Sequence, residues 1–137
     1  MTHNHHSHQP AWSPSGQEIA FANDGSVSVI NDNTRKVRSL PGFQNSYHPS
    51  EGPMSHARPN DFVYLRPRWS PNGNVITAEG VDEGEGWIAA VAARSGIKLF
   101  ETSRSGTSFS WNHESELVIP AFGKFVFDGK SALFNRR

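Results

Sequence analysis

The sequence predicts an all-β fold made of three antiparallel units, each with four short strands. Three observations carry this prediction. Residues 10–16 (PAWSPSG) return at 67–73 as PRWSPNG, with five of seven positions identical. The segments that follow alternate apolar and polar residues with the period of two that is typical of strands. The 12 Gly and 9 Pro among 137 residues favour many tight turns and oppose long helices.

Each unit begins with a tryptophan and a tight turn. In Trp-Ser-Pro-x-Gly, proline presets φ at one corner and glycine accepts the left-handed corner. A weaker third copy at 109–113 (FSWNH) replaces Ser-Pro with Asn112-His113 and lacks the glycine. We expect each tryptophan ring to wedge between adjacent units. The predicted structural residues are Trp12, Trp69, Trp111, Pro14, Pro71, Gly16 and Gly73.

Three strand segments follow each turn. They are predicted at 18–21, 26–29 and 36–40 in the first unit, at 75–78, 87–91 and 97–100 in the second, and at 117–119, 124–127 and 131–134 in the third. The Asp-Gly pairs at 24–25 and 128–129 are hairpin-turn signals. The alanines at 89–90 and 92–93 favour a helix by propensity, but the register of the repeat requires a strand there.

A Trp-Ser-Pro-x-Gly turn followed by an apolar strand, a hairpin and a short exit strand resembles the TolB-type (WD-like) β-propeller repeat. The resemblance covers about 9–40, 66–101 and 109–135, and it implies a partial β-propeller of three four-stranded antiparallel blades within one domain at 9–137. The tryptophan intervals of 57 and 42 positions fit a blade of ~40–45 residues with an insertion at 41–65. Residues 1–8 are predicted to be a disordered, His-rich tail.

Two segments are candidates for a binding site. The insertion carries Tyr47, His48, His56 and Arg58, and an acidic loop at 79–86, between the second and third strands of the second blade, carries Asp82, Glu83 and Glu85. In a propeller, the connection between blades and this loop lie on the same face. We therefore expect these residues to converge there and bind a protein or peptide. The alternative is a solvated acidic loop beside an unrelated Pro-rich bridge.

Metal and cofactor signals are weak. The tail residues His3, His5, His6 and His8 place four imidazoles in six positions, a pattern that can bind transition metals, but an incidental or tag-like tail is the preferred interpretation. The acidic loop does not match the spacing of an EF-hand. The absence of cysteine excludes disulfides, thiolate zinc sites and Cys nucleophiles. No cofactor is expected.

Charge and motifs argue for a non-enzymatic module. The 13 Lys+Arg balance the 13 Asp+Glu, whereas a broad nucleic-acid-binding face carries a basic excess, so no nucleic-acid partner is expected. No apolar run approaches the ~18–20 residues of a membrane span. The chain lacks a Gly-x-Ser-x-Gly nucleophile elbow and a phosphate-binding glycine loop. The alternatives are a fragment or relic of the propeller domain of a prolyl-oligopeptidase-type serine hydrolase, or a propeller that binds a sugar or small ligand.

Three blades leave a propeller open, because rings close with ~4–8 blades. The first and last blades should each expose a flank, and we expect these flanks to include Trp12, Phe21, Phe125, Phe127 and Phe134. Either a homo-oligomer completes the ring or the missing blades belong to a longer parent chain. A complete chain without a secretory signal would be cytoplasmic, whereas a piece of a longer precursor would fit the envelope or periplasm.

Overall fold

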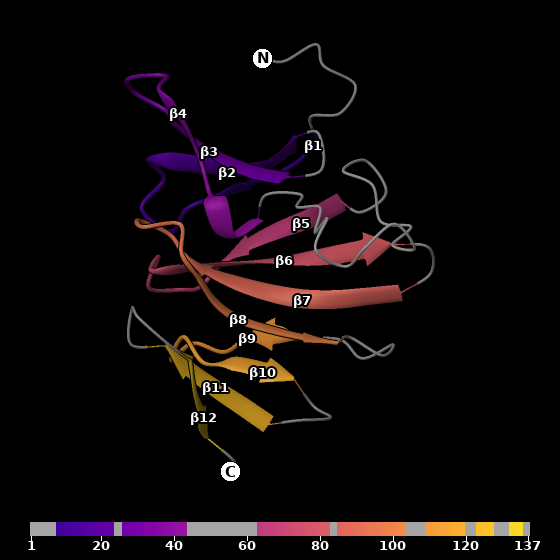
Figure 1. Cartoon of the computed structure of the whole chain (residues 1–137). Helices are drawn as coiled ribbons and strands as arrows, with labels where there is room; N and C mark the ends of the chain where they lie inside the picture. The colour runs from indigo at the N-terminus through magenta and orange to yellow at the C-terminus, as the bar shows by residue number, and fades with distance from the viewer. Residues whose placement is uncertain are drawn as a thin grey trace.

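The fold is all-β, as the sequence predicts. The computed structural model describes residues 8–23, 26–43, 63–82, 85–103, 109–119, 123–127 and 132–135. These residues form three antiparallel four-stranded sheets, each built from consecutive strands. In Figure 1 the sheets lie in a row, from the first blade at the top to the third at the bottom. The chain is therefore a partial propeller of three blades.

The strands follow chain order within each blade. Blade 1 contains β1 (His8–Trp12), β2 (Glu18–Asn23), β3 (Ser26–Asn31) and β4 (Val37–Ser39). Blade 2 contains β5 (Val63–Trp69), β6 (Val75–Asp82), β7 (Glu85–Ala92) and β8 (Lys98–Ser103). Blade 3 contains β9 (Ser110–Trp111), β10 (Leu117–Ile119), β11 (Gly123–Phe127) and β12 (Ala132–Asn135). A short 3-10 helix, η1 (Pro41–Phe43), follows blade 1.

The Trp-Ser-Pro-x-Gly turns have the geometry that their sequence requires. Gly16 and Gly73 have φ values of 78° and 79°, which glycine adopts without the steric cost of a Cβ. In the third copy Ser115 takes this left-handed position at φ 61°. The Asn112 side chain there accepts backbone hydrogen bonds from Glu114 and Glu116, as a serine hydroxyl does in the other two turns.

The first proline of each repeat lies at a bulge. In β1 the register shifts between His8 and Ala11, and in β5 it shifts between Leu65 and Arg68. Pro10 therefore lies in the irregular stretch of β1, and its counterpart Pro67 lies in that of β5. Proline lacks an N–H to donate to the ladder, so bulges tolerate it where regular pairing does not. The sequence analysis gave these two prolines no role.

The tryptophans that end β5 and β9 connect successive blades. The indole Nε1 of Trp69 donates to the backbone carbonyl of Ala11 at 2.9 Å, and that of Trp111 lies 3.4 Å from Thr77 Oγ1. Trp12 departs from the expectation of a wedged ring, because its side chain is 55% exposed. The reason is positional: blade 1 is the first described blade, so no described sheet lies on the side of it that carries Trp12.

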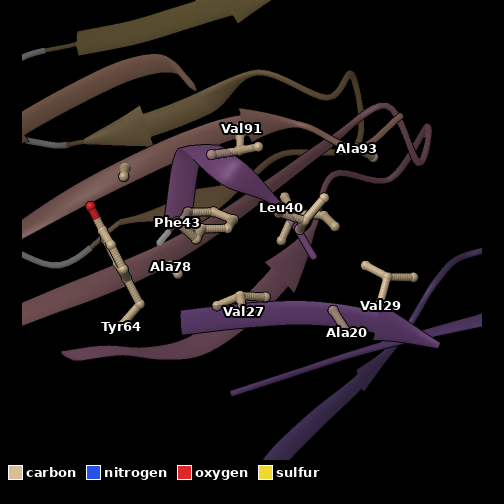
Figure 2. Close-up of a cluster of buried hydrophobic side chains, with 11 residues drawn as sticks. Ala20, Val27, Val29, Leu40, Phe43, Tyr64, Ala78, Val91 and Ala93 are labelled. Carbon is tan, nitrogen blue, oxygen red and sulfur yellow. The ribbon is translucent and has the colours of Figure 1, made fainter. Parts of the chain in front are cut away.

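Two apolar clusters fill the spaces between the sheets. The cluster between blades 1 and 2 contains Ala20, Val27, Val29, Leu40, Phe43, Tyr64, Ile76, Ala78, Ala89, Val91 and Ala93. Figure 2 shows Phe43 of η1 inserted among Leu40, Tyr64 and Val91, and the rings of Phe43 and Tyr64 meet edge to face at 5.3 Å. The cluster between blades 2 and 3 contains Ile88, Phe109, Leu117, Ile119 and Phe125.

Not all of the residues expected on the open flanks are exposed. Phe125 is only 9% exposed, and its ring centroid lies 4.4 Å from that of Phe100, so its assignment to an open flank was wrong. Phe127 is half-buried against Trp111 on the same inner side. Both point inward because pairing places them on the face of β11 that packs on blade 2. Phe21 is half-buried on blade 1, and the side chain of Phe134 is outside the described residues.

The acidic segment at 79–86 is a hairpin rather than a long loop. Strand β6 continues to Asp82, β7 begins at Glu85, and these two residues pair with each other. The strands extend this far because Gly80 leaves room for the Trp87 ring, which would clash with any Cβ at that position. Glu79 is 6% exposed and forms an ion pair with Arg66.

The expected boundaries of the tail and the insertion also shift. The last tail histidine, His8, belongs to β1, where it pairs with Ala22. The expected insertion at 41–65 contributes η1 at its start and the first residues of β5 at its end. Apolar burial explains η1, because Phe43 is fully buried between two blades. Residues 1–7 and 44–62 lie outside the described residues.

We expect Trp69→Ala to destabilise the fold by about 3 kcal/mol, the lower end for loss of a large aromatic, because the ring is only partly buried. Urea unfolding would measure the change. Ile97→Ala is the control, since Ile97 is 61% exposed and its loss should cost no more than about 0.5 kcal/mol. Equal costs for both variants would mean that the Trp69 contact is not important for stability.

A second prediction concerns the turns between the third and fourth strands. Arg35 has φ 63° where blade 2 has Gly96 at 77°. Arg35→Gly should stabilise the chain by about 0.5–1 kcal/mol by removing left-handed strain. Gly96→Ala should cost at least about 1 kcal/mol, since its Cβ would also clash with Pro41. Thermal melts of both variants would test these opposite effects, and a loss of stability in Arg35→Gly would contradict the prediction.

Candidate functional site

The site predicted from sequence is only partly described. Asp82 and Glu85 face each other across the tip of the β6–β7 hairpin, so their backbones are adjacent. Glu83, Tyr47, His48, His56 and Arg58 lie outside the described residues, as do His3, His5 and His6 of the tail. Their convergence therefore stays a prediction. Among the described residues, no group of three or more His, Asp or Glu side chains is gathered in a way that could hold a metal ion.

The described structure offers a different site, a groove of about 370 Å³ between blades 1 and 2. It lies at the other end of the blades, because Asn74 precedes β6 whereas Asp82 ends it; in Figure 1 these ends of β6 are at the left and the right. The lining residues come mainly from the repeated turns and are mostly polar. They are Ser13, Pro14, Ser15, Gln17, Glu18, Asn31, Arg38, Trp69, Asn72, Gly73, Asn74, Ala93 and Arg94.

Arg38 joins the two blades beside the groove. Its guanidinium donates to the backbone carbonyl of Ala93 in blade 2 and lies 3.3 Å from the carboxylate of Glu18 in blade 1. Both side chains are about one-third exposed, so solvent weakens this ion pair, which lies within blade 1. The bond to Ala93 is the one that crosses to blade 2. Arg38 therefore links the two walls of the groove.

Most polar groups of the wall are occupied by the turns themselves. The Asn31 side-chain oxygen accepts from the backbone N–H groups of Asn33 and Thr34. The Asn72 side-chain oxygen accepts from the Ser70 hydroxyl and from the Asn74 N–H. These bonds stiffen the turns, because each satisfies a backbone or hydroxyl donor that a loop would otherwise leave to water.

Three exposed side chains remain available. Gln17, Asn74 and Arg94 make no side-chain hydrogen bond or ion pair with any other described residue. Gln17 and Asn74 occupy equivalent positions in successive repeats, since the carbonyl of each accepts the N–H that follows the third strand, from Asp32 and Ala93 respectively. Among the lining residues, the groups without a described partner are thus two carboxamides from equivalent places and one guanidinium.

This arrangement can bind polar groups. Carboxamides pair with peptide or amide groups, and a guanidinium pairs with carboxylates. The hydroxyls of Ser13 and Ser15 lie 3.1 Å from each other, and no histidine is among the lining residues that could activate them. Sequence analysis missed the groove because it assigned the Ser-Pro-x-Gly turns a purely structural role. Their recurrence in adjacent blades was the available signal.

A second polar cluster supports the core beside η1. The Trp87 Nε1 lies 3.4 Å from the Tyr64 hydroxyl, and the Lys98 ammonium lies 3.4 Å from the same hydroxyl and 2.7 Å from Glu101. Burial alone lowers the pKa of Lys98, but the hydrogen bonds and charges of Glu101 and Tyr64 outweigh it and raise the pKa above its ordinary value. Lys98 therefore stays a cation, with a structural role as the partner of both groups.

The fold recurs in known structures at low sequence identity. No protein-family model matches the chain, and no curated protein matches its sequence. The acylaminoacyl peptidase of Pyrococcus horikoshii superposes with a TM-score of 0.57 at 13% identity, covering 96% of this chain and 25% of the peptidase. TolB of Acinetobacter baumannii superposes with a TM-score of 0.53 at 12% identity, covering 93% of this chain and 31% of TolB. The chain has the TolB-like β-propeller fold.

A third similar structure is the propeller domain of a protease. The β-propeller domain of the Trilobed protease from Pyrococcus furiosus, described as having an open velcro topology, superposes with a TM-score of 0.57 at 16% identity. The match covers 96% of this chain and 44% of that one. The chain thus spans between a quarter and less than half of the structures that it resembles. Among its described residues, no helix is long and apolar enough to cross a membrane.

The contacts of Arg38 predict how much it contributes to stability at the interface between blades 1 and 2. Arg38→Ala should cost about 1.5 kcal/mol, since it removes a charge-assisted bond and a partly exposed ion pair. Chemical denaturation would measure this cost. Arg94→Ala removes the same charge from the same groove without breaking a described bond and should change stability by less than about 0.5 kcal/mol. If the two variants unfold at the same denaturant concentration, Arg38 does not join the blades.

Proposed function

We propose that the chain is a non-enzymatic protein- or peptide-binding propeller module that receives an extended peptide in the groove between blades 1 and 2. The observation that carries this proposal is a set of three polar side chains on hydrogen-bonded turns of two blades, none of which bonds to another described residue. The fold by itself does not choose a function, because propellers support many activities. The argument therefore depends on the chemistry of the groove.

The first step is the match between the lining and a peptide backbone. An extended peptide presents an N–H and a C=O at every residue, and a carboxamide can donate to one and accept from the other. Gln17 and Asn74 provide such groups from successive blades. Arg94 adds a bidentate donor suited to an acidic side chain or a terminal carboxylate. The volume of about 370 Å³ is within the range of ligand sites.

The second step is preorganisation. Binding costs less when the receptor does not lose conformational freedom on contact. The groove walls are already held by turn hydrogen bonds, by Arg38, and by the bond from Trp69 to Ala11 across the interface. A ligand would therefore order only the three free side chains, which supports binding by a largely rigid surface.

A phage-displayed random peptide library, followed by calorimetry with the selected peptide, would test the proposal. The triple variant Gln17→Ala, Asn74→Ala, Arg94→Ala should bind the peptide at least about tenfold more weakly, since these groups would make the direct contacts. Its melting temperature should change little, because none of the three side chains bonds to another described residue.

A second triple variant separates the groove from the face predicted by sequence. Replacing Asp82, Glu83 and Glu85 with Ser removes the acidic hairpin tip at the other end of β6. Weaker binding in this variant alone would place the peptide at the tip and contradict the groove as its site. Full binding by both variants would contradict the groove and the hairpin tip alike as the peptide site, and a library that yields no binding peptide would contradict peptide binding itself.

A second candidate is favoured by the structural comparisons: a propeller portion of a serine hydrolase of the prolyl-oligopeptidase type. Acylaminoacyl peptidase and the Trilobed protease are both described by name as peptidases, and the chain covers only part of each. Immunoprecipitation from the native source, followed by fluorophosphonate labelling, would separate the candidates. A labelled species much heavier than 15.2 kDa favours the hydrolase, and an unlabelled species of that mass favours the module.

A further inference from the structure

The first blade exposes the side that every later blade buries. Trp69 and Trp111 each reach back to the preceding blade, through bonds to Ala11 and Thr77. Trp12 has the same place in the repeat, yet it is 55% exposed with no described blade before it. Both described interfaces between blades contain such a tryptophan contact. Trp12 therefore identifies a third surface of the same kind.

The residues paired with Trp12 form an apolar stripe across blade 1, flanked by polar residues of which Ser28 is buried. Trp12 pairs with Ile19, Ile19 with Ile30, and Ile30 with Val37, and directly paired residues lie on one side of a sheet. Val37 is 58% exposed. The same pairing places uncharged residues at the other positions of this side. We call this surface the Trp12 face: Trp12, Ile19, Phe21, Asn23, Ser26, Ser28, Ile30, Val37 and Ser39.

Blade 2 shows what the Trp12 face becomes when another blade covers it. Ile76 pairs with Trp69 as Ile19 pairs with Trp12. Ile76 is completely buried in the cluster between blades 1 and 2, whereas Ile19 is only half-buried. The covering surface is the side of blade 1 that carries Ala20 and Val29.

Blade 3 presents the corresponding covering surface at the far end of the row. Leu117 and Phe125 point back toward blade 2, so their alternating neighbours Val118, Lys124 and Val126 are on the opposite side. Ser110, which pairs with Val118, precedes Trp111 as Ala11 precedes Trp12. We call this surface the Val118 face: Ser110, Val118, Lys124 and Val126.

We propose that two copies of this chain associate head to tail, the Trp12 face of each against the Val118 face of the other. Two such contacts related by a two-fold axis would close the assembly, and closed symmetry is the usual form of soluble oligomers. Two copies with three blades each give six, within the ~4–8 blades with which propellers close. Each copy would then supply the neighbour that the other's outer blades lack.

Charge complementarity supports a second copy as the occupant. In blade 1 the cation Arg38 pairs with Glu18 and also donates to Ala93 of the next blade. In blade 3 Glu116 follows the turn as Glu18 does, and Lys124 lies 4.0 Å from it. Lys124 is therefore a cation on the side of blade 3 that would meet the next blade.

The first blade places an anion where that cation would arrive. The N–H of Asp32 bonds to Gln17 as the N–H of Ala93 bonds to Asn74, so Asp32 and Ala93 are equivalent residues of their blades. Lys124 lies near Glu116 as Arg38 lies near Glu18, so in one copy it would approach the backbone of Asp32 in the other, where the Asp32 carboxylate adds a negative charge. The overall balance of 13 basic and 13 acidic residues adds little net repulsion between two copies.

Light scattering coupled to size exclusion tests the association, with protein from about 1 to 200 µM. We expect a species of twice 15.2 kDa at high concentration. Trp12→Arg and Val118→Arg, each alone, should raise the dimer dissociation constant by at least about 100-fold, since each buries an unpaired charge in both contacts. Val126→Arg is the substitute if Val118→Arg fails to fold. Ile97→Arg is the matched control, since Ile97 is exposed in the turn before β8 and should leave the dimer intact.

Mixing identifies the head-to-tail arrangement. The Trp12→Arg copy keeps an intact Val118 face, and the Val118→Arg copy keeps an intact Trp12 face. An equimolar mixture should therefore form a heterodimer through one intact contact at concentrations where each variant alone is monomeric. In a parallel test, Asp32→Lys and Lys124→Glu should each weaken the dimer roughly two- to fivefold, and the double variant should recover most of the loss.

Three results would overturn the proposal. The first is a wild-type chain that stays at 15.2 kDa throughout the concentration range. The second is a dimer that is lost in Trp12→Arg but kept in both Val118→Arg and Val126→Arg, which would mean that two Trp12 faces meet each other. The third is a mixture of the two variants that forms no heterodimer.

Discussion

The contact between one blade's tryptophan and the blade before it is the interaction on which the rest of the structure depends. A four-stranded sheet with apolar residues on both sides must bury both, so no blade of this kind is stable alone. Trp69 and Trp111 each contact the preceding blade, and each donates its indole N–H to a residue of that blade. The consequence is visible in the middle blade, where residues 75–80 and 88–93 are all buried. The outer blades each have only one such neighbour among the described residues.

The same constraint positions the candidate binding groove. The turns that line it belong to different blades, and their separation is determined by the packing of the cluster between blades 1 and 2 and by Arg38. The helix η1 contributes to this packing, because Phe43 fills the space beside Tyr64. A ligand in the groove would therefore contact two blades at once. Stability and binding share one interface, yet Gln17 and Asn74 remain unoccupied by either blade.

Much of the fold could be predicted because its signals are local. Turn chemistry places Gly16 and Gly73 in the left-handed region, and a period of two identifies strands within a few residues. For the acidic segment this local approach gave the wrong answer. Its charges indicated a loop, but Gly80 pairs with Trp87 across the strands and the hairpin continues to Asp82. The groove was missed for a related reason. Its side chains belong to separate repeats, and a search along the chain does not bring Gln17 beside Asn74.

The sequence by itself determined the blade: where each strand lies to within a few residues, which residue turns the chain, and how many strands form a sheet. Tertiary structure alone decided the environment of each blade. Trp12 and Trp69 occupy the same position in two nearly identical segments, but one is mostly exposed and the other packs against the core and donates a hydrogen bond to Ala11. The physical reason is that local sequence controls backbone dihedrals, whereas burial depends on whether another sheet lies within contact distance.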